Sequence, residues 1–263
     1  MLKLIYIISW WLQCRFAKKQ IPLKSVIEVE NQPYQHIIDR LKYCCKAGSR
    51  WISFKGTPML WTDGRHDVND LVSVAKKIGF LSVTIHADGL TPLKIDADVI
   101  CLPLNKLDEA EIISNIANSL SKNIRIIMTI NKANYNEIEN MAKFAAGNPQ
   151  IKSVEFNFYR PCEPDPELEL SSELQYLILD KLQELKKNSF PVHNSSCAIA
   201  LMRKEEFKRQ GWVTNYIDKN GNRYNSCSDN NQHDSAPCNF ADAAEMACIF
   251  NFNPETIAEL VNS

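Results

Sequence analysis

Three cysteines near the end of the sequence are the residues best suited to bind a metal. Cys227, Cys238 and Cys248 follow one another there, and His233 lies between the first two. Three thiolates with an imidazole suit zinc, and thiolates alone suit an iron–sulfur cluster. The intervals are long, however, and contain no CxxC pair, which is the spacing that makes such a pattern specific. The pattern therefore predicts either an auxiliary metal site with these three cysteines as ligands, or cysteines that are free or buried thiols.

A polar loop offers a second kind of chemistry. Asp63, Arg65, His66 and Asp67 follow one another closely. An imidazole beside carboxylates can act as a general acid or base. The alternative, which we favour, is a solvated loop that caps the next helix with Asp67 as the N-cap.

Cys162 and Cys197 could join this metal group if the tail folds over the barrel mouth, whereas the remaining four cysteines favour packing over ligation. Cys44 and Cys45 are adjacent in a predicted helix, where neighbouring side chains diverge and cannot converge on one ion. We expect one packed thiol and one near the surface. Cys14 and Cys101 are predicted to be small core residues.

Alternating elements must position these residues. From Lys24 onward, short β-rich runs alternate with amphipathic stretches, and each run is apolar on both faces, as in a parallel sheet covered by helices. The predicted strands are 25–29, 51–54, 82–85, 99–102, 124–130 and 153–158, and the predicted helices between and after them are 34–47, 68–78, 109–119, 135–145 and 172–187.

This order predicts an α/β fold. Strand–helix units of one handedness curl into an incomplete barrel or form a doubly wound sheet, and both place the functional face at the carboxyl ends of the strands. We expect an N-terminal helix in residues 1–22, the strand–helix core in 23–194, and a C-terminal extension in 195–263. The extension is predicted to contain a hairpin around 218–223 and a terminal helix over 254–261.

Several motifs in the core occur in the order seen in one family. KGTPML at 55–60 resembles the GGEPLL segment of radical-SAM enzymes, and 37–54 is similar to their first helix and second strand. VAKKIGFLSVTI with Ala87-Asp88-Gly89 resembles their third strand and its TNG motif, and 126–138 resembles their fifth strand and following helix. The passage 186–194 is similar to a subgroup with a cysteine-bearing tail. The resemblance spans 23–260 and implies an incomplete (β/α)6 TIM-like barrel with an irregular C-terminal extension.

The chain departs from this family where the chemistry begins. The family's first strand leads into a CxxxCxxC loop, whose thiolates hold a [4Fe–4S] cluster. Here Glu28–Asn31, which looks like the strand and its lead-in, runs directly into Gln32–Tyr34 and the first helix. The resemblance therefore implies a protein without the cluster that supplies the electron for cleaving S-adenosylmethionine.

The cofactor contacts depart as well. Thr57 stands where the family has a glutamate for the methionine ammonium, and Lys55 replaces the first glycine of that motif. A neutral hydroxyl cannot offer the charge-assisted hydrogen bond of a carboxylate. These departures argue against tight binding of S-adenosylmethionine. The positions that the resemblance assigns to the cofactor are Gly56, Thr57, Pro58, Asp88, Gly89 and Asn105.

Composition limits the partners and the compartment. Thirty basic and thirty-one acidic residues give a formal charge of −1, so no overall field recruits nucleic acid, and we expect no nucleic-acid partner. Nine cysteines without the dense spacing of a secreted scaffold favour a reducing compartment, and hence a cytoplasmic protein.

The N-terminal segment is strongly apolar. Leu4–Leu12 includes Trp10 and Trp11 and is followed by Arg15 and Lys18. The run is too short to span a bilayer and lacks the small residues of a signal-peptide cleavage site. We expect a helix packed across one end of the domain. The alternative is a helix on a membrane surface with its tryptophans at the interface, which would give a peripheral membrane contact.

Three functional hypotheses follow. The first is a non-catalytic relative of the radical-SAM enzymes that acts as a binding or partner subunit, with a small-molecule ligand or a protein partner. The second is an enzyme that uses iron–sulfur or zinc at the tail cysteines. The third is an active radical-SAM enzyme whose sequence lacks an internal segment near Asn31 and Gln32.

Overall fold

An eight-stranded sheet forms the centre of the molecule in a computed structural model, which describes residues 1–119, 121–159, 165–204, 207, 210–225 and 241–262. The strand order is β6-β5-β4-β3-β2-β1-β7-β8. All pairings are parallel except that of β7 with β8. The strands are β1 (Lys24–Glu28), β2 (Trp51–Lys55), β3 (Ser82–His86), β4 (Val99–Pro103), β5 (Ile124–Ile130), β6 (Ile151–Phe158), β7 (Thr214–Ile217) and β8 (Arg223–Tyr224). The α/β prediction is confirmed.

The helices lie mainly between the strands. They are α1 (Leu2–Arg15), α2 (Tyr34–Ala47), α3 (Val68–Ile78), α4 (Ala110–Ala117), α5 (Ile138–Ala146), α6 (Ser172–Lys187), α7 (Ser196–Arg203), α8 (Ala241–Phe250) and α9 (Pro254–Asn262). Short 3₁₀ turns are η1 (Pro58–Leu60), η2 (Tyr135–Glu137) and η3 (Gly211–Val213). The predicted bounds of α2, α3 and α6 match those observed.

Local chemistry explains where these helices begin and end. Gly48 and Gly79 follow α2 and α3 with φ of 116° and 111°, left-handed conformations in which glycine avoids a Cβ clash. Ser171 caps α6 by accepting a hydrogen bond from the Leu174 N–H. Asp67 forms a capping box with Asp70 at α3. The preferred interpretation of Asp67, an N-cap, is therefore confirmed.

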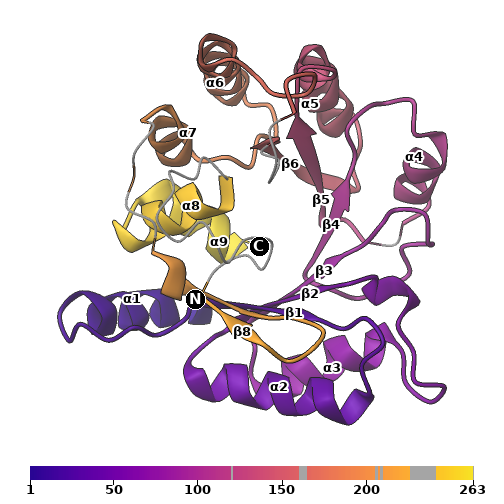
Figure 1. The fold of residues 1–263 in the computed structure, drawn as a ribbon, viewed down its shortest axis with the longest axis vertical. Helices are drawn as coiled ribbons and strands as arrows, with labels where there is room; N and C mark the ends of the chain where they lie inside the picture. The colour runs from indigo at the N-terminus through magenta and orange to yellow at the C-terminus, as the bar shows by residue number, and fades with distance from the viewer. Residues whose placement is uncertain (120, 160–164, 205–206, 208–209, 226–240, 263) are drawn as a thin grey trace.

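The sheet has helices on both of its sides. Figure 1 shows α2 to α6 around the outside of the curve, while α8 and α9 lie on the opposite side, within it. The strand β7, from the predicted C-terminal extension, pairs in parallel with β1. The extension and the strand–helix core therefore share one sheet. The predicted hairpin is also confirmed, because β7 and β8 pair in antiparallel fashion around the turn.

Helix α1 packs across the amino ends of the strands, as its preferred interpretation predicted. Ile7, Trp10 and Cys14 are buried against residues that begin strands, including Leu23 and Trp51. The Trp10 indole N–H donates to the Ile21 carbonyl at 2.7 Å, which satisfies the polar atom of a buried ring. Burying each large side chain stabilises the fold by about 2 kcal/mol. Among the described residues, no helix combines the length and the apolar character needed to cross a bilayer.

A disulfide between Cys197 and Cys248 joins α7 to α8. This pair differs from the reduced thiols that the cysteine usage indicated. Cys14, Cys44 and Cys101 are buried free thiols and Cys45 is half-buried. The packing predicted for these four cysteines is confirmed.

The disulfide should stabilise the docking of α8. Its half-cystines lie 51 positions apart, and closing a loop of that length removes enough chain entropy from the unfolded state to contribute about 2–4 kcal/mol. We expect Cys197→Ser combined with Cys248→Ser to lower the free energy of unfolding by that amount, measured by urea denaturation.

The control is Cys45→Ser, which removes a free thiol. Dithiothreitol should lower the urea midpoint of the wild type and of Cys45→Ser but not that of the double variant. A wild-type midpoint that does not respond to the reductant would contradict the prediction.

Candidate functional site

The two faces of the sheet differ in chemistry. Side chains that point toward α2 to α6 are apolar and buried, for example Phe54 and Ile85. Side chains of the opposite face, here called the inner face, alternate with them and are half-buried in β5 and in the second half of β6. The interior of an ordinary barrel is filled by branched apolar residues. A polar inner face is therefore the strongest indication of a functional surface.

A row of polar side chains crosses this face from strand to strand. The row begins at Lys55 of β2, which is in register with Glu28 of β1. His86 of β3 is in register with Cys101 of β4, and Cys101 with Arg125 of β5. Because residues in register on neighbouring strands point the same way, the row gathers an ammonium, an imidazole, a thiol and a guanidinium.

Electrostatics sets the protonation of this row. Burial, followed by the positive charges of Lys55, Lys24 and Arg125, holds the pKa of His86 well below its usual value, so its imidazole is neutral at pH 7. Burial raises the pKa of Cys101 to about 11 against the opposing effect of Arg125. Cys101 is therefore a thiol at neutral pH, not a thiolate nucleophile.

Two ion pairs border the row. Arg125 Nη1 lies 4.0 Å from Glu155 Oε2, and both side chains are about 15% exposed. Glu155 also accepts a hydrogen bond from the Asn157 amide at 3.0 Å. Lys24 Nζ lies 3.1 Å from Asp242 Oδ1 on α8. Burial alone would raise the pKa of that carboxyl, but the positive charges of Lys24, Lys55 and Arg125 together lower it. Half of the Asp242 side chain is exposed, so solvent screening limits this pair to less than about 1 kcal/mol.

The start of α8 is attached to the same face. The Ala241 N–H donates to the Asn157 side-chain oxygen at 3.0 Å, beside the Lys24–Asp242 pair. A helix from the C-terminal extension therefore contributes a carboxylate to the inner face. Among the described residues Lys55, unlike Lys24 and Arg125, forms no salt bridge.

The connection between β1 and α2 is short and covered by aromatic rings. The Val29 N–H donates to the Lys55 carbonyl at 2.9 Å, which ties the connection to β2. The buried Trp61 donates its indole N–H to the Gln32 carbonyl at 2.9 Å. Tyr34 stacks on His66 with ring centroids 3.9 Å apart. These contacts close the chain over the carboxyl end of β1.

The six positions assigned by the resemblance lie in loops after β2, β3 and β4, at one edge of the sheet. Gly56 has φ of 74°, and a Cβ there would lie 3.2 Å from that of Glu30. Thr57 is exposed and Pro58 is buried. In Gly89 a Cβ would meet Ile112 at 3.0 Å. The fold brings these residues to the edge where the prediction placed them.

Two of the six already use their side chains within the protein. Asp88 Oδ1 accepts from the Leu90 and Thr91 N–H groups, so it shapes the loop after β3. Asn105 Oδ1 accepts from the Thr129 N–H at 2.8 Å and joins the β4 loop to β5. Both oxygens are therefore engaged within the protein, one in its own loop and one with β5.

The predicted metal ligands are only partly within the described structure. Cys227 and Cys238, with His233, lie outside the described residues. The sulfur of Cys248 is bonded to Cys197, so in this state Cys248 is not a thiolate ligand. Within the described ranges, no three His, Cys, Asp or Glu side chains are arranged to hold a metal ion.

The polar loop before α3 is held together by Asp63. Its carboxylate accepts from the Arg65 and His66 N–H groups, and these bonds with the His66 ring lower the pKa of Asp63 to about 2. His66 therefore binds within the loop and against Tyr34. The loop is therefore a structural cap, in which the His66 ring and the Asp63 carboxylate contact each other.

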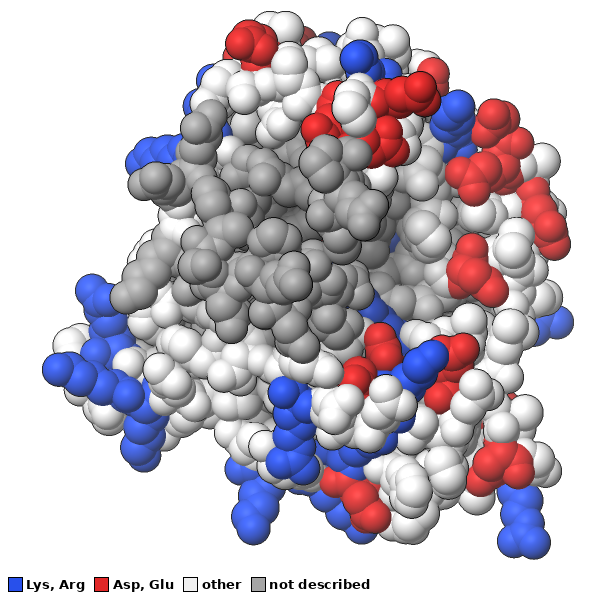
Figure 2. Space-filling view, in the orientation of Figure 1, with Lys and Arg blue, Asp and Glu red and all other residues white. Residues whose placement is uncertain are grey.

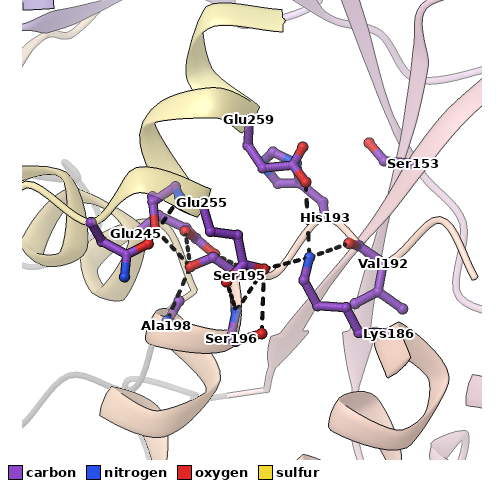
Figure 3. Close-up of polar contacts among 12 residues, drawn as sticks. Ser153, Lys186, Val192, His193, Ser195, Ser196, Ala198, Glu245, Glu255 and Glu259 are labelled. Carbon is purple, nitrogen blue, oxygen red and sulfur yellow. Dashed lines mark hydrogen bonds and ion pairs between the residues drawn. The ribbon is translucent and has the colours of Figure 1, made fainter. Parts of the chain in front are cut away.

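A second polar cluster docks the C-terminal helices, as Figure 3 shows. Glu245 of α8 accepts from the Ser195 N–H and hydroxyl, both at 2.7 Å, at the start of α7. The Ser196 N–H donates to Glu255 of α9 at 3.0 Å. Lys186 Nζ lies 3.1 Å from Glu255, which completes a link from α6 to α9. Two carboxylates thus satisfy the free N–H groups at the start of α7.

The titration of this cluster is dominated by burial. Burial raises the pKa of Glu245 to about 7, against the hydrogen bonds from Ser195 that favour its charged form. Burial also holds the pKa of His193 well below its usual value. Its contact with Glu259 at 4.0 Å is therefore not an ion pair at neutral pH.

Sequence reasoning missed Arg125, Glu155 and Asp242. The signal for the first two was present, because Arg125 is a charged residue in a mainly apolar strand, and Glu155 alternates with Ser153 and Asn157 on one face of β6. Asp242 gave no such signal, since only the fold brings α8 to β1.

Comparison of the sequence with models of known protein families gives no match, and comparison with curated proteins gives none either.

Glu245 should make stability depend on pH. Its pKa is about 7 in the folded protein and near 4.5 when unfolded, so between these values the folded state binds more protons. The contribution is therefore largest below pH 4.5, falls by up to about 3 kcal/mol as pH rises to 7, and is flat above. We expect Glu245→Gln to remove this slope, measured as urea unfolding free energy across that range.

Glu111→Gln is the matched control, because it removes an exposed carboxylate from the first turn of α4. If Glu245→Gln retains the wild-type slope, Glu245 is not the group responsible.

Proposed function

We propose that this chain is a non-catalytic, radical-SAM-like protein whose sheet corresponds to an incomplete (β/α)6 barrel and whose inner face binds a small polar ligand. The proposal combines the motif resemblance with the polar inner face. It makes the protein a binding subunit that keeps the scaffold of an enzyme without its electron-donating centre.

The β1–α2 connection is the observation that carries the proposal. A cluster loop would have to emerge between Glu28 and Tyr34. The chain there instead forms hydrogen bonds with Lys55 and Trp61. The described free cysteines lie elsewhere: Cys44 contacts Asn215, while Cys14 packs in α1. The residues present do not fit a three-thiolate cluster site at this edge.

The contacts at the expected cofactor edge support the same conclusion. The Asp88 side-chain oxygen accepts hydrogen bonds within its own loop, and the Asn105 side-chain oxygen accepts one from β5. Thr57 carries a neutral hydroxyl where a carboxylate would meet an ammonium. The second hypothesis, a metal enzyme built on the tail cysteines, is weakened because the sulfur of Cys248 is already bonded.

The inner face favours a ligand that carries an acidic group. Lys55 lies in register with Glu28, which is engaged by the Tyr216 hydroxyl and by the Lys219 N–H. The Lys55 ammonium and the neutral His86 imidazole are thus the groups best placed to bind a carboxylate or phosphate. The Arg125 guanidinium is paired with Glu155, so we expect it to orient the acidic group of the ligand rather than to bind that group.

The loss of radical chemistry is tested by metal content and product formation. We expect anaerobic reconstitution with iron and sulfide to leave no stoichiometric [4Fe–4S] cluster, and incubation with S-adenosylmethionine and dithionite to give no 5′-deoxyadenosine. The physical reason is that, within the described structure, no thiolates converge at the carboxyl end of β1. Formation of a cluster together with 5′-deoxyadenosine would overturn the proposal.

Ligand class is tested by thermal unfolding with a panel of small carboxylates and phosphates. We expect acidic compounds to raise the melting temperature of the wild type, and Lys55→Met to weaken their binding at least tenfold, because a charge-assisted hydrogen bond contributes about 1.5–3 kcal/mol. The control is Lys42→Met, which removes an exposed lysine from the opposite side of the sheet, on α2. Equal stabilisation of both variants would contradict the assignment to the inner face.

A further inference from the structure

Helix α1 has two apolar sides, and the fold uses only one of them. Ile7, Trp10 and Cys14 recur at helical spacing and are buried against the domain. On the opposite side Ile5, Ile8, Leu12 and Phe16 follow the same spacing but stay exposed, with Ile5 55% and Phe16 72% exposed. We call this exposed set the α1 outer face. A helix that is apolar on both sides needs a second apolar environment.

Aromatic side chains extend the α1 outer face onto the rest of the protein. The ring of Trp11 lies 5.7 Å from that of Phe16 and 4.7 Å from that of Phe252, which follows α8 and is 37% exposed. The Trp11 N–H donates to the Phe250 carbonyl at 2.8 Å, so its ring is held in place. Aromatic rings with one apolar and one polar side favour the boundary between lipid and water.

The charge beside the α1 outer face is positive. Residues 1–27 contain no Asp or Glu, and Arg15, Lys18 and Lys19 follow at the end of the helix, where all three are exposed. Figure 2 shows Lys and Arg side chains, without Asp or Glu among them, at the left edge of the molecule over the end of α1. Lys3 lies near Asp98 and is not counted among these cations.

We propose that the α1 outer face docks the protein on an anionic lipid surface, with the apolar side chains in the headgroup boundary and Arg15, Lys18 and Lys19 on lipid phosphates. Such binding couples buried apolar area to attraction by anionic lipid, about fivefold in affinity for each cation. This surface is separate from the inner face, so the inference does not depend on the ligand proposed above.

A second copy of the chain fits the α1 outer face less well. A 14-residue helix is roughly 21 Å long and presents on the order of 200 Å² on one side, well below the roughly 800 Å² that each partner of a stable dimer buries. In a contact between two such helices, neither copy offers an acidic residue from 1–27 to pair with the other's cations. A bilayer supplies both the apolar layer and the negative charge.

The test is flotation of the full chain with vesicles of phosphatidylcholine alone or mixed with phosphatidylglycerol. We expect binding to the mixed vesicles that weakens as salt is raised, and a blue shift of tryptophan fluorescence on binding. Ile5→Glu with Ile8→Glu should lower the affinity at least a hundredfold, because both side chains leave the headgroup boundary. Lys18→Gln with Lys19→Gln should lower it by about twenty-fivefold.

The matched control places the same charges on exposed leucines elsewhere. Leu60→Glu with Leu177→Glu should leave vesicle binding unchanged, since these residues lie after β2 and on α6. Far-UV circular dichroism and thermal unfolding check that each variant is folded, and the Lys18 and Lys19 substitutions lie outside α1. The proposal is overturned if the wild type fails to float with mixed vesicles, if the Ile5 and Ile8 variant floats as well as the wild type, or if light scattering shows a dimer that this variant disrupts.

Discussion

Apolar packing of one side of a parallel sheet against α2 to α6 is the interaction on which the rest of the structure depends. Because Phe54, Ile85 and their neighbours supply that core, the opposite side of the strands is free to carry charge. A closed barrel fills its interior with branched side chains and has little room for such a choice. Here the described strands leave the sheet open, with β6 and β8 at its two edges. Apolar packing and polar side chains are thereby assigned to different faces of the same strands.

Helix α8 is attached to the rest of the protein by polar and covalent contacts. Helix α8 brings Asp242 to Lys24, Glu245 to Ser195, and Cys248 to Cys197. Each contact has a different physical basis, since one is an ion pair, one a buried hydrogen-bonded carboxyl, and one covalent. The helix is thus held at three points by interactions that respond separately to salt, pH and reductant.

Regular elements were predictable where local chemistry and periodicity agreed. The bounds of α2 and α3 followed from their amphipathic pattern with Gly48 and Gly79 as stops, and the strands followed from apolar runs. Helix α8 was missed because its sequence, ADAAEMACIF, is buried on nearly every side and shows no helical period. The pairing of Cys197 with Cys248 was also missed, because the partners lie far apart in the sequence.

For the candidate site, the sequence predicted only its place at the carboxyl ends of the strands. Strand order placed Gly56, Asp88 and Asn105 at the carboxyl ends of neighbouring strands, but it did not predict that Asp88 bonds within its loop or that Asn105 bonds to β5. The inner face depends on register across β1 to β6, which converts isolated residues such as Arg125 into members of one row. The parallel pairing of β7 with β1 has a further consequence for biosynthesis. Ser25 and its bonded neighbour Asn215 are separated by 190 positions, so one side of β1 stays an unprotected strand edge until the ribosome has made β7. A nascent chain that stalls before this point exposes that edge to other chains, which makes the interval between the synthesis of β1 and that of β7 the period of greatest aggregation hazard.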